Sequence, residues 1–278
     1  MVSESPFSIT NASGETIHGD FRWGDATGER PALVICHGFT AHKDWGPFPH
    51  MGRRFAELGF ASVVFNFSHN GIGRNFRKFT ELGKFARNTI GKEVEDLRAV
   101  VAALTDGTVG KGIVDPARIG AIGHSRGGGV AVLAASVDSR IRGVAAWSSV
   151  STFYRYTPHQ KALWEEQGFL PVKIKGVESR LRFGLGVLRD LEANREAYDL
   201  LGAVKKLRVP FQILHGSADV SVKQKEPEEL FAVADKRKTE YVLLEGVGHS
   251  FGATHPYRDN PTVDHVVELT ARWFHLFL

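Results

Sequence analysis

The five residues from Gly123 to Gly127 constrain this chain more than any other stretch, because they read Gly-His-Ser-Arg-Gly. An apolar segment, residues 118–123, leads into them, and a run of small residues, 127–136, follows. This arrangement predicts a strand that turns sharply into a helix. A serine on such a turn has a strained backbone, and the glycines are needed where strand and helix crowd together. The pattern predicts Ser125 as a nucleophile above a helix N-terminus, although 30 glycines in 278 residues make chance matches common.

A serine hydroxyl is a weak nucleophile at neutral pH, so it needs a base and a group that orients the base. Two later apolar strands end in polar segments that supply them, with Asp219 in the first and His249 in the second. We expect both side chains at the same sheet edge as Ser125. Asp219 has an alternative role as a helix cap or turn residue. After Trp147, however, the next acidic residue is Glu165, far beyond the strand end, which favours Asp219 as the acid.

The rest of the chain alternates between short apolar segments and helical ones. We predict buried strands at residues 31–36, 61–67, 118–123, 143–147, 210–214 and 240–244. We predict helices at residues 47–58, 90–104, 127–136, 227–234 and 262–277, and an edge hairpin at residues 7–23. Apolar strands covered by helices indicate an α/β protein with a mostly parallel sheet.

Residues 149–207 break this alternation. They contain no clean strand pattern, but they carry several aromatic residues and a charged helical stretch at about 188–206. We interpret residues 1–278 as one domain with residues 149–207 inserted as a small cap. No internal repeat or linker divides the chain.

With these motifs in place, the chain resembles the α/β-hydrolases from Pro31 to Leu278. The resemblance implies a mostly parallel eight-stranded sheet flanked by helices. It also implies that Ser125 attacks an acyl carbon, that His249 transfers the proton and that Asp219 orients the imidazole. Backbone N–H groups of Phe39 and Arg126 would form the oxyanion hole.

Several further residues are predicted to lie near the substrate. The predicted pocket comprises His37, His69, His124, Trp147, Phe153, Tyr154 and Trp164. His37 and His215 precede glycines at strand ends, so a role in fixing loops is the alternative for both. Each aromatic residue of the insertion has core packing as its alternative. The Arg126 side chain either covers the helix end or binds an acidic group of the substrate, and we favour the structural role.

Within the α/β-hydrolases the chain is similar to small carboxylesterases, the cinnamoyl and feruloyl esterases and the dienelactone-hydrolase-like branch, through the segment from His37 to Thr40 and the modest insertion. The dienelactone hydrolases use a cysteine nucleophile, whereas this chain has Ser125. The expected activity is hydrolysis of short-chain or aromatic carboxylic esters through an acyl-enzyme. An acyl-peptide or peptidase-like amide hydrolase is one alternative, although such enzymes carry a propeller for which residues 1–31 leave no room. A catalytically silent, ligand-binding relative is the other.

Composition excludes several other classes. Lysine and arginine number 35 against 31 acidic residues, and the basic stretch from Arg74 to Lys92 is interpreted as a solvated face, so no nucleic-acid partner is expected. Cys36 is the only cysteine, so no intramolecular disulfide or cysteine metal site is possible. No apolar run is long enough to span a membrane, and the N-terminus lacks a signal pattern. We expect a cytoplasmic monomer or homodimer that uses neither metal nor cofactor.

Overall fold

The computed structural model describes residues 1–73, 78–173 and 180–278. Arg74, Phe76 and Arg77 of the basic stretch, and residues 174–179 of the insertion, lie outside the described residues. The strands are β1 (Val2–Thr10), β2 (Thr16–Gly24), β3 (Arg30–Cys36), β4 (Ala61–Phe65), β5 (Val114–His124), β6 (Ile141–Trp147), β7 (Phe169–Pro171), β8 (Arg182–Gly184), β9 (Phe211–Gly216) and β10 (Thr239–Leu244). The helices are α1 (Phe48–Glu57), α2 (Leu82–Phe85), α3 (Ile90–Thr105), α4 (Arg126–Val137), α5 (Pro158–Gln167), α6 (Leu185–Ala193), α7 (Leu200–Lys206), α8 (Lys225–Val233) and α9 (Pro261–Phe274).

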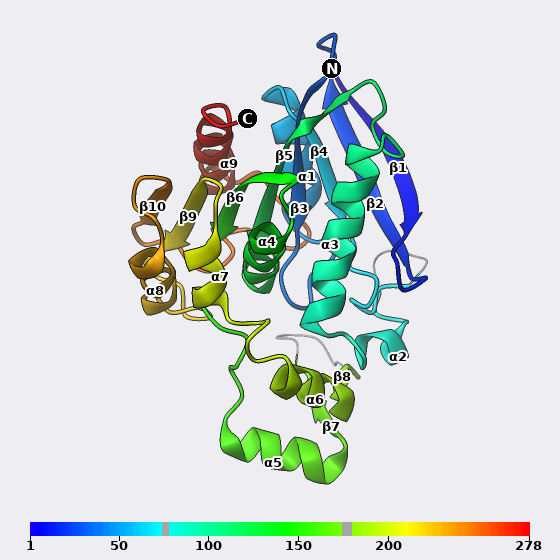
Figure 1. The fold of residues 1–278 in the computed structure, drawn as a ribbon, viewed down its shortest axis with the longest axis vertical. Helices are drawn as coiled ribbons and strands as arrows, with labels where there is room; N and C mark the ends of the chain where they lie inside the picture. Colours follow the sequence, from blue (N-terminus) through cyan, green and yellow to red (C-terminus); the bar gives the residue numbers. More distant parts are fainter. Residues whose placement is uncertain (74–77, 174–179) are drawn as a thin grey trace.

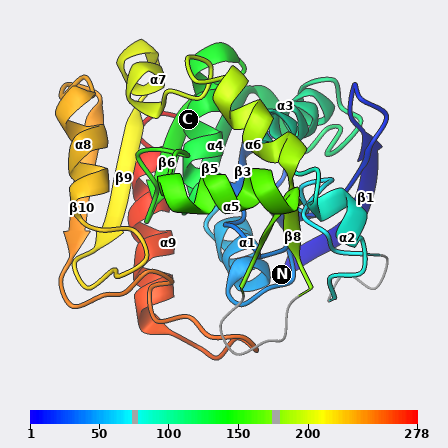
Figure 2. The ribbon, with the colours of Figure 1, turned by 90° about the horizontal axis from the view of Figure 1, so that it is seen from below.

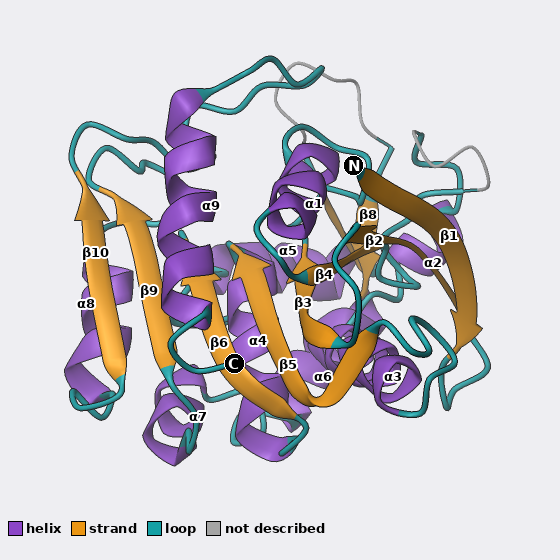
Figure 3. Cartoon of the chain, turned by 90° about the horizontal axis from the view of Figure 1, so that it is seen from above, coloured by secondary structure: helices purple, strands orange, loops and turns teal. Residues whose placement is uncertain are grey.

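Eight of these strands form one twisted sheet in the order β1-β2-β4-β3-β5-β6-β9-β10 (Figure 3). β1 and β2 are an antiparallel edge hairpin, β2 pairs antiparallel with β4, and the remaining pairs are parallel. The prediction of a mostly parallel eight-stranded sheet is therefore confirmed. β5, which carries the Gly-His-Ser-Arg-Gly segment at its end, lies in the middle of the sheet, where β3 and β6 flank it.

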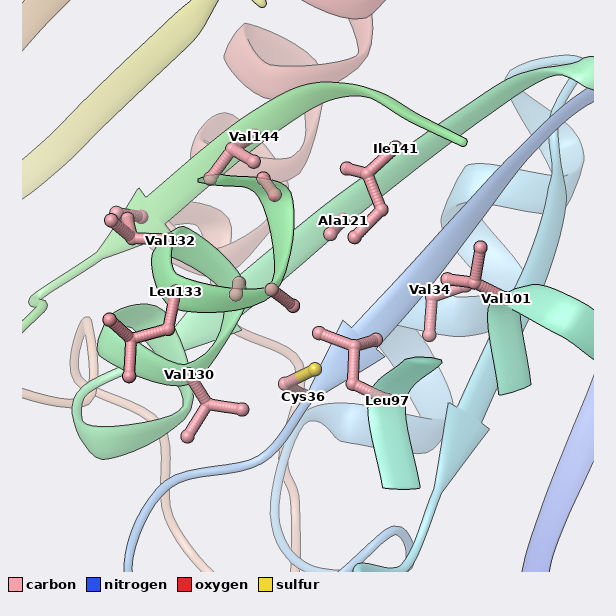
Figure 4. Close-up of a cluster of buried hydrophobic side chains, with 14 of the residues drawn as sticks. Val34, Cys36, Leu97, Val101, Ala121, Val130, Val132, Leu133, Ile141 and Val144 are labelled. Carbon is pink, nitrogen blue, oxygen red and sulfur yellow. The ribbon is translucent and has the colours of Figure 1, made fainter. Parts of the chain in front are cut away.

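Helices cover both faces of the sheet. Figure 3 shows α1 and α9 on one face and α3, α4, α7 and α8 on the other. The larger core lies beneath α3 and α4, where Leu97 and Val101 of α3 meet Val34 and Ala121 of the strands (Figure 4). Leu97 is completely buried. This two-sided burial explains why β3 and β4 are apolar throughout most of their length rather than alternating.

The elements α5, α6, β7 and β8 of the predicted cap lie beyond the carboxyl ends of the strands, whereas α7 packs on α4. Figure 1 shows α5, α6, β7 and β8 grouped together there, and Figure 2, turned to that side, shows α5 lying across the molecule. In the small core of these elements, Trp164 stacks on Phe183, and Phe183 stacks on Phe85 of α2. The backbone N–H of Gly184 donates to Ala86 O at 2.8 Å, so β8 is tied to the loop that follows α2.

The structure of this segment adds two details to what the sequence indicates. β7 and β8 form a small antiparallel pair where no strand was expected, because three residues per strand are too few to show alternation. The charged stretch at 188–206 is two helices, α6 and α7, rather than one. Asn194 ends α6, since its side-chain N–H donates to Asp190 O at 2.9 Å. The chain then turns to bury Tyr198, whose hydroxyl donates to Asp190 Oδ2 at 2.9 Å.

The core beneath α3 gives a direct test of this packing. Leu97→Ala removes a fully buried side chain, and we expect it to lower the free energy of unfolding by about 2–5 kcal/mol because a cavity remains. Val137→Ala, at the 66% exposed end of α4, is the matched control and should change it by less than about 0.5 kcal/mol. Urea denaturation measures both, and equal effects would contradict the packing.

Candidate active site

Ser125 lies on a strained turn between β5 and α4. Its backbone has φ 55° and ψ −119°, a conformation that non-glycine residues rarely adopt. A Cβ at Gly123 would lie 2.1 Å from Gly127 O, and a Cβ at Gly127 would lie 2.5 Å from His37 O. Only glycine fits at either position. The Ser125 N–H donates to Trp147 O at 2.8 Å, which fixes the turn to the end of the neighbouring strand β6.

Asp219 and His249 meet at the same sheet edge. His249 Nδ1 lies 2.7 Å from Asp219 Oδ2, and the Asp219 side chain is fully buried, whereas that of His249 is 21% exposed. Asp219 Oδ1 accepts the N–H groups of Ser221 at 2.8 Å and Val222 at 2.9 Å. Burial raises the pKa of Asp219, but the hydrogen bonds from His249 and these N–H groups outweigh it, so the pKa is lowered. An ionised Asp219 can only accept, so Nδ1 of His249 carries the proton and Nε2 is free to act as a base.

Two further histidines hold this pair in place. His124 Nε2 lies 2.9 Å from His249 O, and the two rings are 4.8 Å apart between centroids. Burial lowers the pKa of His124 to about 3, so the ring is neutral and donates to that carbonyl. His215 is completely buried; its Nε2 lies 3.1 Å from Val222 O and 3.7 Å from Asp219 Oδ2. His124 therefore fixes the loop of His249, and His215 the loop of Asp219.

The loop after β3 passes directly beside the nucleophile. A Cβ at Gly38 would lie 3.3 Å from the Ser125 Cβ. His37 Nδ1 lies 2.9 Å from Gly38 O, and its Nε2 accepts from Asn70 Nδ2 at 3.2 Å. Burial lowers the pKa of His37 to about 4, so it stays neutral and serves to fix this loop.

The two N–H groups predicted as oxyanion donors belong to this loop and to the start of α4. In the residues that the structure describes, the backbone N–H of Phe39 and that of Arg126 both lack an acceptor. Arg126 is the first residue of α4, where backbone N–H groups have no intrahelical partner. Both N–H groups are thus free to donate, and Phe39 and Arg126 line the same cavity as Ser125.

A cavity of about 260 Å³ opens beside Ser125. It is lined by Phe39, Ser125, Arg126, Val150, Phe153, Arg155, Tyr156, Ser221 and Val222. Of the seven residues predicted for the pocket, Phe153 alone is among these lining residues. Val150, Arg155, Tyr156, Ser221 and Val222 were not predicted. Their signal is topological, since they follow β6 and β9, two neighbouring strands on one side of β5.

The other predicted pocket residues lie elsewhere. Besides His37 and His124, which fix loops, Trp147 is buried and donates from Nε1 to Thr270 Oγ1 at 3.0 Å. Trp164 is completely buried in the core of the inserted segment. The Tyr154 hydroxyl donates to Leu191 O at 2.8 Å. His69 lies against Ser68 at 2.9 Å and 3.7 Å from Glu15. For these four residues, internal packing rather than substrate contact is what the structure shows.

The described ranges contain no group of three or more His, Cys, Asp or Glu side chains placed to hold a metal ion. Among the same residues, no helix combines the length and apolar character needed to cross a membrane.

Comparison with known proteins agrees with this geometry. The model of the alpha/beta hydrolase family matches residues 33–261, and the chain belongs to this family. An uncharacterized 31.7 kDa protein of Escherichia coli, encoded in the traX-finO intergenic region, is 28% identical over 122 residues, which are 44% of this chain and 38% of that protein. The match thus spans well under half of that relative's length.

Solved structures share the fold over nearly the whole chain. The esterase domain of a Rhodothermus marinus protein superposes with a TM-score of 0.67 at 19% identity, covering 99% of both chains. The alpha/beta hydrolase GrgF from Penicillium sp. sh18 gives a TM-score of 0.76 at 17% identity, also covering 99% of both. At these identities the likeness shows the fold, in agreement with the alpha/beta hydrolase family.

Buried histidines make the stability of the fold dependent on pH. Burial lowers the pKa of His37, His42 and His69 to about 4 and that of His124 to about 3. In the unfolded chain these groups titrate near 6.5, so between about pH 4 and 6.5 the unfolded chain binds more protons than the folded one. The free energy of unfolding therefore falls as the pH drops below 6.5, by about 1.4 kcal/mol per pH unit for each neutral histidine. Asp96, whose pKa burial raises to about 6, and Asp190, whose pKa burial also raises, change the free energy of unfolding in the opposite direction.

We expect His69→Gln to reduce the slope of the free energy of unfolding against pH by the contribution of one histidine, about 1.4 kcal/mol per pH unit. His69 is chosen because it lies away from Ser125, and exposed His159→Gln is the control. Urea denaturation at several pH values between 7 and 5 gives the slope. A slope for His69→Gln equal to that of the wild type would contradict the assignment.

Proposed function

We propose that this hydrolase cleaves carboxylic esters of short-chain or aromatic acids through an acyl-enzyme on Ser125. The observation that carries the proposal is the 2.7 Å contact between His249 and buried Asp219 at the sheet edge where Ser125 lies on its strained turn. Ser125, Asp219 and His249 follow three separate strands, and we propose that they act as nucleophile, orienting carboxylate and base. This is the arrangement that acyl transfer requires.

The proposed reaction has two halves. Ser125 Oγ attacks the ester carbonyl while His249 Nε2 takes its proton, and the negative charge on the carbonyl oxygen is stabilised by the N–H groups of Phe39 and Arg126. The intermediate collapses, the C–O bond to the alcohol breaks, and His249 returns the proton to the departing alcohol. Water, deprotonated by His249, then attacks the acyl carbon, and the acid leaves as Ser125 regains its proton. Asp219 stabilises the imidazolium in both halves.

The size and lining of the cavity support a small acyl group. A volume of about 260 Å³ is below the range of roughly 300–1,000 Å³ that is usual for sites that hold drug-sized ligands. Phe39, Val150, Phe153 and Val222 provide apolar surface that suits a short chain or one aromatic ring. The segment 149–207, which we propose as a cap, contributes Phe153, Arg155 and Tyr156 to this wall. The Rhodothermus marinus domain of the same fold is an esterase, which supports an ester as the substrate class.

The three catalytic residues are expected to act as a unit. Ser125→Ala and His249→Ala should each lower kcat by about 10⁴- to 10⁶-fold for p-nitrophenyl acetate, and the double variant should be no slower than either. Ser136→Ala, on the same helix α4 but away from the cavity, is the matched control and should keep wild-type kinetics. Independent, multiplying losses would contradict the shared mechanism.

The small cavity predicts a chain-length limit. Across p-nitrophenyl esters from acetyl to dodecanoyl, kcat/KM should be highest for the short acyl groups and should fall beyond octanoyl, because longer chains exceed the cavity. Methyl ferulate tests the aromatic acyl group, and a p-nitroanilide of a short acid serves as the amide comparison. Activity that rises steadily beyond octanoyl would contradict the small cavity, and faster cleavage of the anilide would favour an amide hydrolase.

A further inference from the structure

The side chain of Arg126 is only partly used by the protein. Its Nε donates to both carboxylate oxygens of Glu93, at 2.8 and 3.0 Å, and this pair lies inside the protein, with 14% of the Arg126 and 5% of the Glu93 side chain exposed. Asn88 Nδ2 donates to Glu93 Oε1 at 2.7 Å and anchors the acid. The guanidinium is therefore held in one position, one residue after the nucleophile.

The outer end of the guanidinium has no comparable partner. Arg126 Nη2 is buried, and within the described part of the chain it has no hydrogen-bond acceptor. Aromatic rings pack near it, with the guanidinium carbon 5.6 Å from the centroid of Phe39 and 5.9 Å from that of Phe183. A buried N–H of a charged group without an acceptor is costly, so such groups are rarely left unused.

A purely structural role does not explain this cation. Arg126 is at the N-terminus of α4, where the helix dipole disfavours positive charge. Glu93 compensates for the charge, but a neutral residue in place of both would avoid the problem altogether. The structure thus points away from the helix-end role favoured by the sequence and toward a ligand.

Tyr156 supplies a second donor in the same cavity. Its hydroxyl has no hydrogen-bond partner among the residues that the structure describes. Burial raises its pKa, which keeps the phenol protonated and able to donate. Arg155 also lines the cavity, but it is engaged by Glu226 and by Ser221 O at 3.0 Å. Among the described residues, the lining of the cavity includes no acidic side chain.

We propose that Arg126 and Tyr156 bind a carboxylate on the acyl group of the substrate, so that the preferred substrates are monoesters of short dicarboxylic acids. This rests on the proposed function, since Ser125 must cleave the ester while the two donors hold the far end of the acyl chain. A carboxylate offers several acceptor sites, which matches a charged N–H and a hydroxyl that belong to two residues of the same cavity and have no acceptor among the described residues. The apolar residues Val150, Phe153 and Val222 would surround the methylene groups between.

Two esters of matched shape test this recognition. Monomethyl glutarate carries a terminal carboxylate, and methyl isoheptanoate replaces it with an isopropyl group of similar shape. The readout is the ratio of kcat/KM for the charged ester to that for the neutral ester, measured by methanol release. We expect a ratio of roughly 10 or more in the wild type.

Two variants test whether Arg126 and Tyr156 cause the preference for the charged ester. Tyr156→Phe removes one hydroxyl and should lower the ratio by roughly 10-fold. The double variant Glu93→Gln with Arg126→Met removes both charges together, so that no buried acid is left unpaired, and should lower the ratio by on the order of 100-fold. Arg142→Gln, an exposed arginine at the opposite end of the strands, is the control and should leave the ratio unchanged.

Binding of glutarate to Ser125→Ala, measured by calorimetry, separates the two proposals. Binding that Tyr156→Phe weakens supports the carboxylate site whether or not any ester is cleaved. Hydrolysis of neutral esters, together with a wild-type ratio near 1 and no glutarate binding, would overturn the carboxylate site and leave the esterase in place. Glutarate binding without hydrolysis of any ester would overturn the esterase and leave the site.

Discussion

The strained turn at Ser125 is the constraint on which the site depends. Its positive φ directs the serine out of the sheet, and it can form only because Gly123 and Gly127 let the strand and the helix come within backbone contact. The same closeness brings the loop after β3 against the turn, where a Cβ at Gly38 would lie 3.3 Å from the Ser125 Cβ. The close backbone contact between β5, α4 and the loop after β3 therefore positions both Ser125 and the residues proposed to supply the oxyanion donors.

Neutral histidine side chains, rather than ion pairs, hold the loops that carry the other proposed catalytic groups. His37, His124 and His215 are buried with lowered pKa values, and each makes a hydrogen bond to a backbone carbonyl of a loop that the mechanism uses. Asp219 stays ionised because backbone N–H groups and His249 satisfy it. Two ion pairs border the cavity beside Ser125, Arg155 with Glu226 and Arg126 with Glu93. Arg126 keeps an N–H without an acceptor among the described residues, which gives that pair its significance for substrate choice.

The sequence predicted the sheet and the positions of Ser125, Asp219 and His249 because those depend on short-range patterns at strand ends. It did not predict the cavity wall, which depends on packing between distant segments. Tyr154 and Tyr156 look alike in the sequence, yet Tyr154 bonds to Leu191 O while Tyr156 lines the cavity. Trp164 is buried by stacking on Phe183, a contact that no local pattern encodes. The role of His124 depends on a loop 125 positions away along the chain.

The central claim is that Ser125 is a nucleophile activated by His249, and covalent labelling tests it most directly. The native protein should be treated with a fluorophosphonate and the modified residue located by peptide mass spectrometry. We expect a single adduct on Ser125 that forms rapidly in the wild type and is lost in His249→Ala, although Ser125 is still present in that variant. Absence of an adduct on the native protein, or equal labelling in His249→Ala, would contradict the claim and favour a ligand-binding protein without catalytic activity.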